Sequence, residues 1–360
     1  MKTVLVLYGG RSGEHEVSLV SAASVARAID SRWAVLLAGI DKEGVWYFQP
    51  EEELLRIKKD AGSPLRVIKN SGEILGIIPG RGIARGGELL AIDVVFPVLH
   101  GSFGEDGLLQ GLLENARLAY AGSGVLGSAL CMDKDKVKQI WRETGLPVVP
   151  SLTLRKTQDT ACCVAAAEKE MGYPLFVKPS RTGSSVGISK AHSRAELETA
   201  LREAFRFDTK VLIEKAINAR EIECSVVGNH APRAFTPGEI IPSHEFYDYA
   251  AKYTDPQGAR LLIPADLDSA MLEKIKGLAV RAYVAAEAAG LARVDFFVEK
   301  GTGNIFINEI NTIPGFTPIS MFPRLCAHDG LSYPDLVNEL LELGISRFRE
   351  TEELVFSYTP

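Results

Sequence analysis

The chain has 360 residues, 46% of them apolar and 24% charged, a composition that excludes intrinsic disorder and is sufficient for two or three domains. Its formal net charge of −6 argues against nucleic acid as a partner, because affinity for phosphate backbones needs clustered Lys and Arg. The N-terminal MKTVLVLYGG lacks the pattern of a signal peptide, and charges interrupt the alanine-rich stretch 270–289. We therefore expect a cytoplasmic protein that does not bind membranes.

The first part of the chain has the pattern of a parallel α/β sheet. Continuous apolar runs at 3–8, 33–40 and 92–98 predict strands, and the stretch 17–29 after the GGRSGEHE loop predicts a helix. Apolar strands separated by helices are typical of a parallel sheet that is covered on both faces. We assign residues 1–125 to this domain, which ends at the glycine-rich segment LAYAGSGVLGS.

Two α+β units are predicted to follow, at 126–214 and 215–360. The first has expected helices at 134–144, 157–170 and 193–205 and expected strands at 151–155, 174–178, 186–190 and 210–214. The second has expected strands at 221–228, 234–241, 293–299 and 304–310, a helix at 266–289 and a polar loop at 242–262. The five cysteines contain no CxxC pair and are odd in number, which predicts neither disulfides nor a thiolate metal site.

The stretch VKPSRTGSSVGISK places Lys178 on a strand just before a run of small hydroxyl and glycine residues. A Walker A loop has the opposite order, with the lysine after the glycines. One interpretation is a glycine-rich hairpin whose N–H groups close over phosphates while the lysine neutralises their charge. The other is a lysine that extends to solvent beside an ordinary hairpin.

The stretch RVDFFVEKGTGNIFINEIN places Asp295 on one strand and Glu309 and Asn311 on the next. Residues two apart on a strand point to the same face, so Glu309 and Asn311 share one. Two carboxylates and an amide are hard oxygen ligands, which suit Mg²⁺ bound to substrate phosphates. The alternative is a solvated sheet edge with capping side chains.

The order of these and other motifs over nearly the whole chain resembles the D-alanine–D-alanine ligases of the ATP-grasp superfamily. The motifs are HEVSL (15–19), HGSFGEDG (100–107), MDKDK (132–136), VKPSRTGSSVG (177–187), VLIEK (211–215), EFYDYAAKY (245–253), RVDFF (293–297) and NEINTIPGFT (308–317). The resemblance implies an ATP-grasp fold of α/β and α+β class, with an N-terminal Rossmann-like (pre-ATP-grasp) domain built on a parallel sheet.

The resemblance also implies where ATP and metal bind. Its phosphate lysines would be Lys134 and Lys178, the flap over the nucleotide would be residues 181–187 with Ser185, and Lys252 would neutralise the transferred phosphoryl group. Adenine would meet Glu214, Lys215 and Ile217, and Glu221 would hold the ribose. Two Mg²⁺ ions, with Mn²⁺ as an alternative metal, would be bound by Asp295, Glu309 and Asn311.

The implied reaction joins two D-alanines through a D-alanyl phosphate. Glu16 matches the acid that holds the ammonium group of the first substrate, with Ser184 and Tyr253 as hydrogen-bonded partners that close a lid across three domains. Arg293 and the N–H of Gly315 match the oxyanion site. The remaining matches concern the second substrate: Ser320 and Met321 would receive its carboxylate, and His100 lies near the same pocket.

Three other interpretations remain open at this point. A related ligase that makes D-alanyl-D-lactate lacks the tyrosine at the position of Tyr253, so Tyr253 favours the enzyme that forms an amide. A regulatory nucleotide-binding module would lack metal ligands or Arg293, all of which are present. An ATP-grasp carboxylate–amine ligase for another substrate need not contain HEVSL or the 245–253 loop. The family also suggests a homodimer formed through the first domain.

Overall fold

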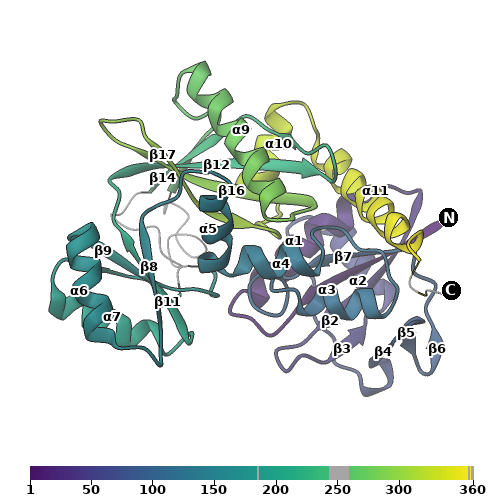
Figure 1. The fold of residues 1–360 in the computed structure, drawn as a ribbon. Coiled ribbons are helices and arrows are strands. Elements are labelled where there is room, and N and C mark those ends of the chain that lie inside the picture. Colours follow the sequence, from purple (N-terminus) through teal and green to yellow (C-terminus); the bar gives the residue numbers. More distant parts are fainter. Residues whose placement is uncertain (185, 243–258, 356, 358–360) are drawn as a thin grey trace.

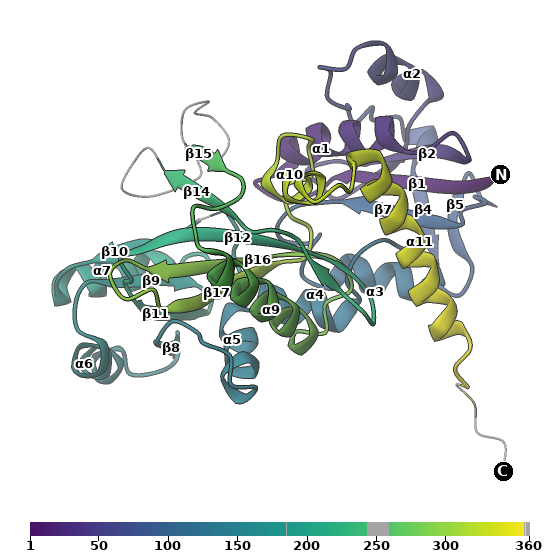
Figure 2. The same cartoon turned by 90° about the horizontal axis from the view of Figure 1, so that it is seen from above.

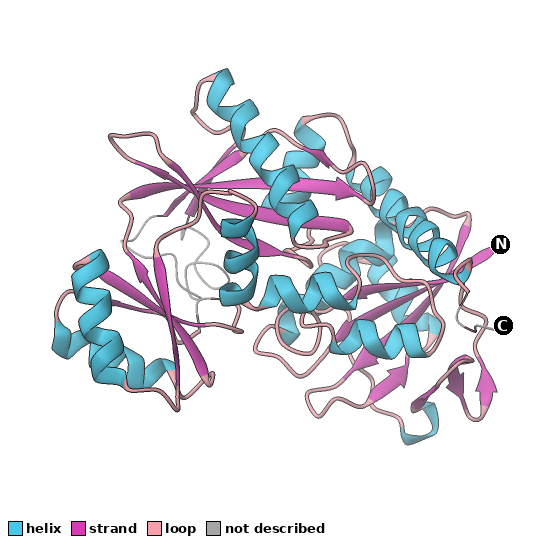
Figure 3. Ribbon diagram, viewed as in Figure 1, coloured by secondary structure: helices cyan, strands magenta, loops and turns pink. Residues whose placement is uncertain are grey.

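The computed structural model describes residues 1–184, 186–242, 259–355 and 357, and these form three main sheets with helices on their outer faces (Figures 1 and 3). The mixed α/β architecture agrees with the predicted fold class. No helix within these ranges is both long and apolar enough to cross a membrane.

The N-terminal sheet has the strand order β3-β2-β1-β7. Its members are β1 (Lys2–Gly9), β2 (Trp33–Ile40), β3 (Trp46–Phe48) and β7 (Val94–Val98). β1 runs parallel to β2 and to β7, as the apolar runs predicted, while the short β3 is antiparallel to β2. Every residue from Val4 to Tyr8 is fully buried, because helices cover both sides of β1. Helix α1 (His15–Ala28) follows β1, and α3 (Leu108–Asn115) follows β7.

Residues 50–90, for which the sequence gives no clear pattern, pack on both faces of this sheet, with a helix on one side and a small set of strands on the other (Figure 2). Leu54 and Ile57 share a core with Val4, whereas Leu75 and Ile83 share another core with Leu5. The elements of this segment are α2 (Glu51–Lys59), the 3-10 turn η1 (Ser71–Glu73) and the antiparallel strands β4 (Leu75–Ile78), β5 (Gly82–Arg85) and β6 (Glu88–Leu89).

The second sheet is antiparallel, in the order β10-β9-β11-β8. Its strands are β8 (Ser151–Arg155), β9 (Leu175–Pro179), β10 (Ser189–Ala191) and β11 (Lys210–Lys215). Helices α6 (Thr160–Met171) and α7 (Arg194–Ala204) cover its outer face (Figure 1). Helices α4 (Val125–Met132) and α5 (Lys134–Glu143) connect it to the first sheet.

The third sheet has the order β15-β14-β12-β16-β17, and a further strand, β13, pairs with β12. Its strands are β12 (Ala219–Gly228), β13 (Arg233–Ala234), β14 (Gly238–Pro242), β15 (Ala259–Leu262), β16 (Gly290–Glu299) and β17 (Ile305–Asn311). The strand predicted at 234–241 is thus two strands, since Pro237 lies between them and cannot donate a ladder hydrogen bond. The helix predicted at 266–289 is the shorter α9 (Ser269–Ala285), which Asp268 caps through the N–H of Met271.

The last helix returns to the first sheet. After α10 (Met321–His328), helix α11 (Tyr333–Glu352) runs alongside β7 and β1 (Figure 2), and Leu336, Leu340 and Leu341 share one core with Val4 and Val6. The division into 1–125, 126–214 and 215–360 stays a proposal, and in it α11 belongs to the third unit by sequence but packs on the first.

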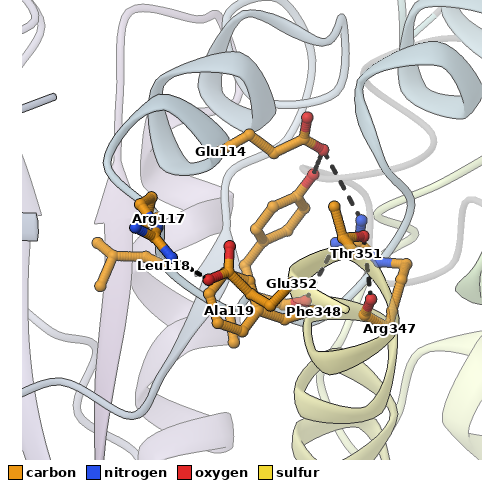
Figure 4. A pocket seen from close by; sticks show the side chains of 9 residues that line it. Glu114, Arg117, Leu118, Ala119, Arg347, Phe348, Thr351 and Glu352 are labelled. Atoms are coloured by element: carbon orange, nitrogen blue, oxygen red, sulfur yellow. Dashed lines mark hydrogen bonds and ion pairs between the residues drawn. The ribbon is translucent and has the colours of Figure 1, made fainter. Parts of the chain in front are cut away.

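Polar contacts hold the end of α11 against residues 114–120. Arg117 pairs with Glu352, and Glu114 accepts a hydrogen bond of 2.7 Å from Tyr120 and lies 3.8 Å from Arg347 (Figure 4). A cavity of ≈ 500 Å³ remains between the two segments. The helix is therefore fixed at this end by charged groups and along its length by apolar ones.

Replacing Gly344 with alanine should destabilise this packing. A Cβ atom at Gly344 would lie 2.5 Å from the carbonyl oxygen of Tyr120, so α11 would have to move away from the first sheet, at a cost of about 1–3 kcal/mol. The matched control is Gly277→Ala in α9, where a Cβ meets no atom within 4 Å and should stabilise the helix by up to about 1 kcal/mol. Urea unfolding measures both, and equal effects of the two substitutions would contradict the close packing.

Candidate functional site

One large cavity of ≈ 1400 Å³ collects the residues that the sequence singled out. It is lined by loops of the N-terminal sheet, by β9 and β11 of the second sheet and by β12, β16 and β17 of the third. Of the predicted site residues it includes Glu16, His100, Lys134, Lys178, Ser184, Glu214, Lys215, Ile217, Glu221, Arg293, Asp295, Glu309, Asn311, Gly315, Ser320 and Met321. Three further predicted residues, Ser185, Lys252 and Tyr253, lie outside the described residues.

The register of the third sheet brings charged side chains together on one face. Asp295 pairs with Glu223 of β12 on one side and with Glu309 of β17 on the other, and Arg293 pairs with Asn311. The guanidinium of Arg293 donates two hydrogen bonds of 2.7 Å to Asp295 and lies 3.1 Å from Glu223. Burial alone would lower the pKa of Arg293, but these two carboxylates outweigh it and raise the pKa, so the side chain stays charged.

Glu223 was not predicted as a site residue. Its spacing of two from Glu221 on a strand is the signal that could have identified it, because both side chains then share a face.

The donors on this face suit a magnesium ion. No group of three or more His, Cys, Asp or Glu side chains in the described part of the chain has the arrangement of a complete metal site. Asp295 and Glu309 nevertheless lie side by side, and Asn311 donates a hydrogen bond of 3.0 Å to Asp295. Mg²⁺ commonly takes only one or two protein carboxylates and completes its shell with phosphate oxygens and water. The residues therefore fit the metal in the form in which it accompanies a nucleotide.

Two lysines and a glutamate, namely Lys134, Lys178 and Glu214, line another part of the cavity. Lys178 on β9 lies 2.6 Å from one carboxylate oxygen of Glu214 on β11 and donates a hydrogen bond of 3.2 Å to Asn308. Lys134, the first residue of α5, donates to the carbonyl of Thr182 in the flap at 2.8 Å and lies 3.4 Å from Glu309. Lys134 thus bridges the flap and β17, and Lys178 bridges β11 and β17.

The other oxygen of Glu214 pairs with Lys138 of α5, which sequence analysis did not identify. Burial alone would raise the pKa of Glu214, but the two lysines outweigh it and lower the pKa to about 2. Burial lowers the pKa of Lys138 to about 8, although Glu214 opposes the change. Lys138 lies four residues after Lys134, and this helical spacing is the signal that could have revealed it.

The acid that contacts the flap is Glu14 and not the predicted Glu16. The hydroxyl of Ser184 donates a hydrogen bond of 2.6 Å to Glu14, which precedes α1. Glu16 lies in the first turn of α1, where its side chain is 66% exposed and pairs with Lys42 at 2.5 Å. Successive helical residues point about 100° apart, so positions 14 and 16 face different ways. The pairing of Ser184 with Glu16 was therefore wrong by two residues.

The close approach of Glu14 depends on a glycine. A Cβ atom at Gly101, whose φ is +75°, would lie 2.8 Å from the carboxylate of Glu14. Ser184 itself has φ +49°, a left-handed conformation that residues other than glycine seldom adopt. The contact between the flap and the first domain is thus built on two unusual backbone positions.

His100 and Glu105 connect the HGSFGEDG loop to residue 313. In the ring of His100, Nδ1 lies 2.9 Å from the carbonyl oxygen of Ile313 and Nε2 lies 3.2 Å from the hydroxyl of Ser21. Burial lowers the pKa of His100, which favours the neutral ring. Since a carbonyl can only accept, Nδ1 donates to Ile313. Glu105 accepts from the N–H groups of Gly101 (2.6 Å) and Ile313 (3.0 Å). Burial and the nearby charge of Glu14 raise the pKa of Glu105 to about 8. The role of His100 in binding substrate stays a prediction.

The N-terminus of α10 forms the end of the cavity. Ser320 precedes this helix, and its hydroxyl accepts a hydrogen bond of 3.1 Å from the N–H of Thr317, while Met321 is the first helical residue and is buried. Gly315 lies beside Ser320. A helix N-terminus attracts carboxylates, because its first N–H groups have no partner within the helix.

The short link between β11 and β12 forms the remaining edge. Lys215 ends β11, Ile217 lies in the link, and Glu221 lies near the start of β12, all three facing the same cavity as Lys178. Their proposed roles at adenine and ribose stay predictions.

Comparisons with known proteins agree with this geometry. Residues 3–123 match the family model described as the N-terminus of D-ala D-ala ligase, and residues 140–342 match the model of its C-terminus. The D-alanine–D-alanine ligase of Treponema denticola is 48% identical over 98% of this chain and 98% of its own, and D-alanine–D-alanine ligase A of Chromobacterium violaceum is 46% identical over 97% and 96%.

Solved structures give the same result. The D-alanine-D-alanine ligase from Coxiella burnetii is similar with a TM-score of 0.85 at 36% identity, covering 98% of this chain and 96% of that one. The VanG D-Ala:D-Ser ligase from Enterococcus faecalis is similar with a TM-score of 0.84 at 35% identity, covering 95% and 99%. The ATP-grasp fold with a parallel N-terminal sheet, predicted from the motifs, is thereby confirmed, and the chain belongs to the D-alanine–D-alanine ligase family, whose members are ATP-dependent.

Proposed function

We propose that this enzyme joins two D-alanines into D-alanyl-D-alanine, a precursor of peptidoglycan, in a reaction driven by ATP. The observation that carries the proposal is that one cavity contains two lysines, two carboxylates and the N-terminus of α10. The lysines are Lys134 and Lys178, and the carboxylates are Asp295 and Glu309. The lysines and the helix N-terminus suit negatively charged reactants, namely ATP and an amino-acid carboxylate, and the carboxylates suit the Mg²⁺ that accompanies ATP.

ATP would lie between the second and third sheets. Lys134 and Lys178 would face its phosphates, the flap 181–187 with Ser185 would cover them, and Lys252 would approach the transferred phosphoryl group. Adenine would contact Glu214, Lys215 and Ile217, and Glu221 would accept hydrogen bonds from the ribose. Asp295, Glu309 and Asn311 would hold two Mg²⁺ ions, with Mn²⁺ as an alternative. These ions would neutralise negative charge on the phosphate oxygens.

The first D-alanine would be held by its ammonium group on the carboxylate of Glu14, to which Ser184 already bonds. Tyr253 would complete this contact across the lid. The substrate carboxylate would attack the terminal phosphorus of ATP, so that a carboxyl-oxygen-to-phosphorus bond forms as ADP leaves. Closure of the lid would keep water away from the resulting acyl phosphate.

The second D-alanine would enter with its carboxylate at Ser320 and Met321, near His100. Its amine, once deprotonated, would attack the carbonyl carbon, and phosphate would leave as the amide bond forms. Arg293 and the N–H of Gly315 would stabilise the negative charge that develops on the carbonyl oxygen.

The test is phosphate release from ATP and Mg²⁺ with D-alanine, L-alanine, or D-alanine together with D-lactate or D-serine, with each product identified by its mass. Release with D-alanine and formation of the dipeptide is the expected result. A preference for the mixed product with D-lactate or D-serine would instead assign the enzyme to a related specificity. No release with any pair would contradict the proposal.

We also propose that the enzyme is a cytoplasmic homodimer. ATP as a co-substrate supports the location. Leu108 and Leu112 on α3 are 57% and 45% exposed, and Leu126 on α4, just past the proposed end of the first domain, is 59% exposed. Such apolar side chains suit a contact between two copies at or beside their first domains. Sedimentation velocity should give the mass of a dimer, and Leu112→Glu should shift it to that of a monomer. A monomeric unaltered protein would contradict the dimer.

A further inference from the structure

We propose that Lys138 is a positioning residue for the nucleotide: it holds Glu214 in place so that Lys178 keeps its positive charge for the phosphates of ATP. The inference deepens the proposed function and rests on it. Lys138 comes from α5, Glu214 from β11 and Lys178 from β9, so three separate elements converge on one carboxylate. Each lysine contacts a different oxygen of Glu214, Lys138 at Oε1 and Lys178 at Oε2.

A contribution to stability alone does not explain why Lys138 is buried here. The side chains of Lys138 and Glu214 are only 1% and 2% exposed, whereas Lys178 is 10% exposed and lines the cavity. Burying an ion pair costs several kcal/mol per ion, and replacement by apolar side chains is often neutral or stabilising. A lysine retained at such a position therefore needs a reason beyond stability.

Attachment of α5 does not supply that reason. Val137 and Trp141 of the same helix are 1% and 0% exposed in the core, and the indole N–H of Trp141 donates a hydrogen bond of 3.0 Å to the carbonyl of Ala282. Asp135, also in α5, pairs with Lys210 at 3.1 Å and accepts a hydrogen bond of 2.7 Å from Thr153. The helix is thus fixed on both sides of Lys138 by other contacts.

The charges of the cluster explain the need for a second lysine. With Lys138 present, two ammonium groups share one carboxylate, and one positive charge remains in excess at the wall of the cavity. Without Lys138, Lys178 and Glu214 would cancel, and one oxygen of Glu214 would lose its partner in a buried position. The whole charge of Glu214 would then be balanced by Lys178 alone, and a nucleotide would meet one positive charge fewer at the wall of the cavity.

The experiment compares nucleotide binding in Lys138→Met with binding in the unaltered enzyme, using calorimetry with ADP and Mg²⁺ and no D-alanine. The dissociation constant should rise about tenfold to a hundredfold, the range that an unpaired buried charge implies. In turnover, the KM for ATP should rise far more than kcat falls. The matched control is Lys136→Met, because Lys136 lies on the same helix and faces solvent. Among the partners described, its side chain bonds only to Gln139, at 2.9 Å.

A double-mutant cycle separates positioning from packing. If Lys138 acts through Glu214, the variant Lys138→Met/Glu214→Gln should bind ADP no more weakly than Glu214→Gln alone. The inference would be overturned if the losses of ADP affinity in the two single variants multiplied in the double variant. It would also be overturned if Lys138→Met bound ADP as tightly as the unaltered enzyme. Should Lys138→Met fail to fold, the comparison between the double variant and Glu214→Gln still decides. The double variant removes both buried charges, so it leaves no unpaired carboxylate at Glu214. The measurement needs no D-alanine, so a wrong amino-acid substrate would not affect it.

Discussion

Replacing Asp295 with alanine should reduce turnover by roughly 10³-fold or more, the largest effect that we expect from a single substitution. Asp295 contacts both the proposed oxyanion group and the proposed metal ligands. It accepts two hydrogen bonds of 2.7 Å from Arg293, and it lies between Glu223 and Glu309 in the sheet. Its loss would remove a proposed metal ligand and also release the guanidinium proposed to stabilise the oxyanion. Phosphate release with D-alanine over a range of Mg²⁺ concentrations measures the effect.

The control is Glu299→Ala at the end of the same strand, where the carboxylate bonds only to the turn residues Thr302 and Asn304 among the contacts described. Its activity should equal that of the unaltered enzyme. Asp295→Asn keeps an oxygen but loses the charge, so it should recover part of the activity at high Mg²⁺. Undiminished turnover of Asp295→Ala at low Mg²⁺ would show that this carboxylate does not hold the metal.

Substituting Glu14 with glutamine should lower kcat/KM for D-alanine by about 10²-fold, whereas Glu16→Gln should have almost no effect. Glu14 accepts the hydrogen bond of 2.6 Å from Ser184, so it is the acid that connects the first domain to the flap. Glu16 is paired with Lys42 at the surface. Steady-state kinetics of the two variants, with D-alanine varied at saturating ATP, test the assignment directly. The reverse order of effects would restore Glu16 as the acid that holds the substrate.

Much of the first sheet was readable from local patterns, because β1, β2 and β7 are continuous apolar runs, but the three-residue β3 was not predicted. The elements within residues 50–90 were not predicted either, since β4, β5 and β6 are two to four residues long and lack a clear alternation. Helix α11 was also missed: its charged exposed face resembles a solvated tail, and only the tertiary packing of Leu336, Leu340 and Leu341 reveals the apolar one.

Within the site, motif order predicted the composition but not every contact. Whether residue 14 or residue 16 of the GEHE sequence faces the flap depends on where α1 begins. A sequence determines the start of a helix only to within a few residues. Lys138 and Glu223 were not predicted, because each contacts another side chain that lies far away in the chain. The partner of Lys138 is Glu214, and that of Glu223 is Arg293. Spacing within one element shows that two residues share a face but not what they face.

The position of α11 also affects how the molecule is made. During synthesis the N-terminal strands leave the ribosome first, but the apolar surface that Leu336, Leu340 and Leu341 cover stays open until the final helix emerges. Between the end of β7 and the start of α11 the ribosome needs on the order of 10 to 50 s at roughly 5–20 residues per second. For that time the nascent chain carries an incomplete core, which is a natural binding surface for a chaperone and a point at which a prematurely terminated product would aggregate.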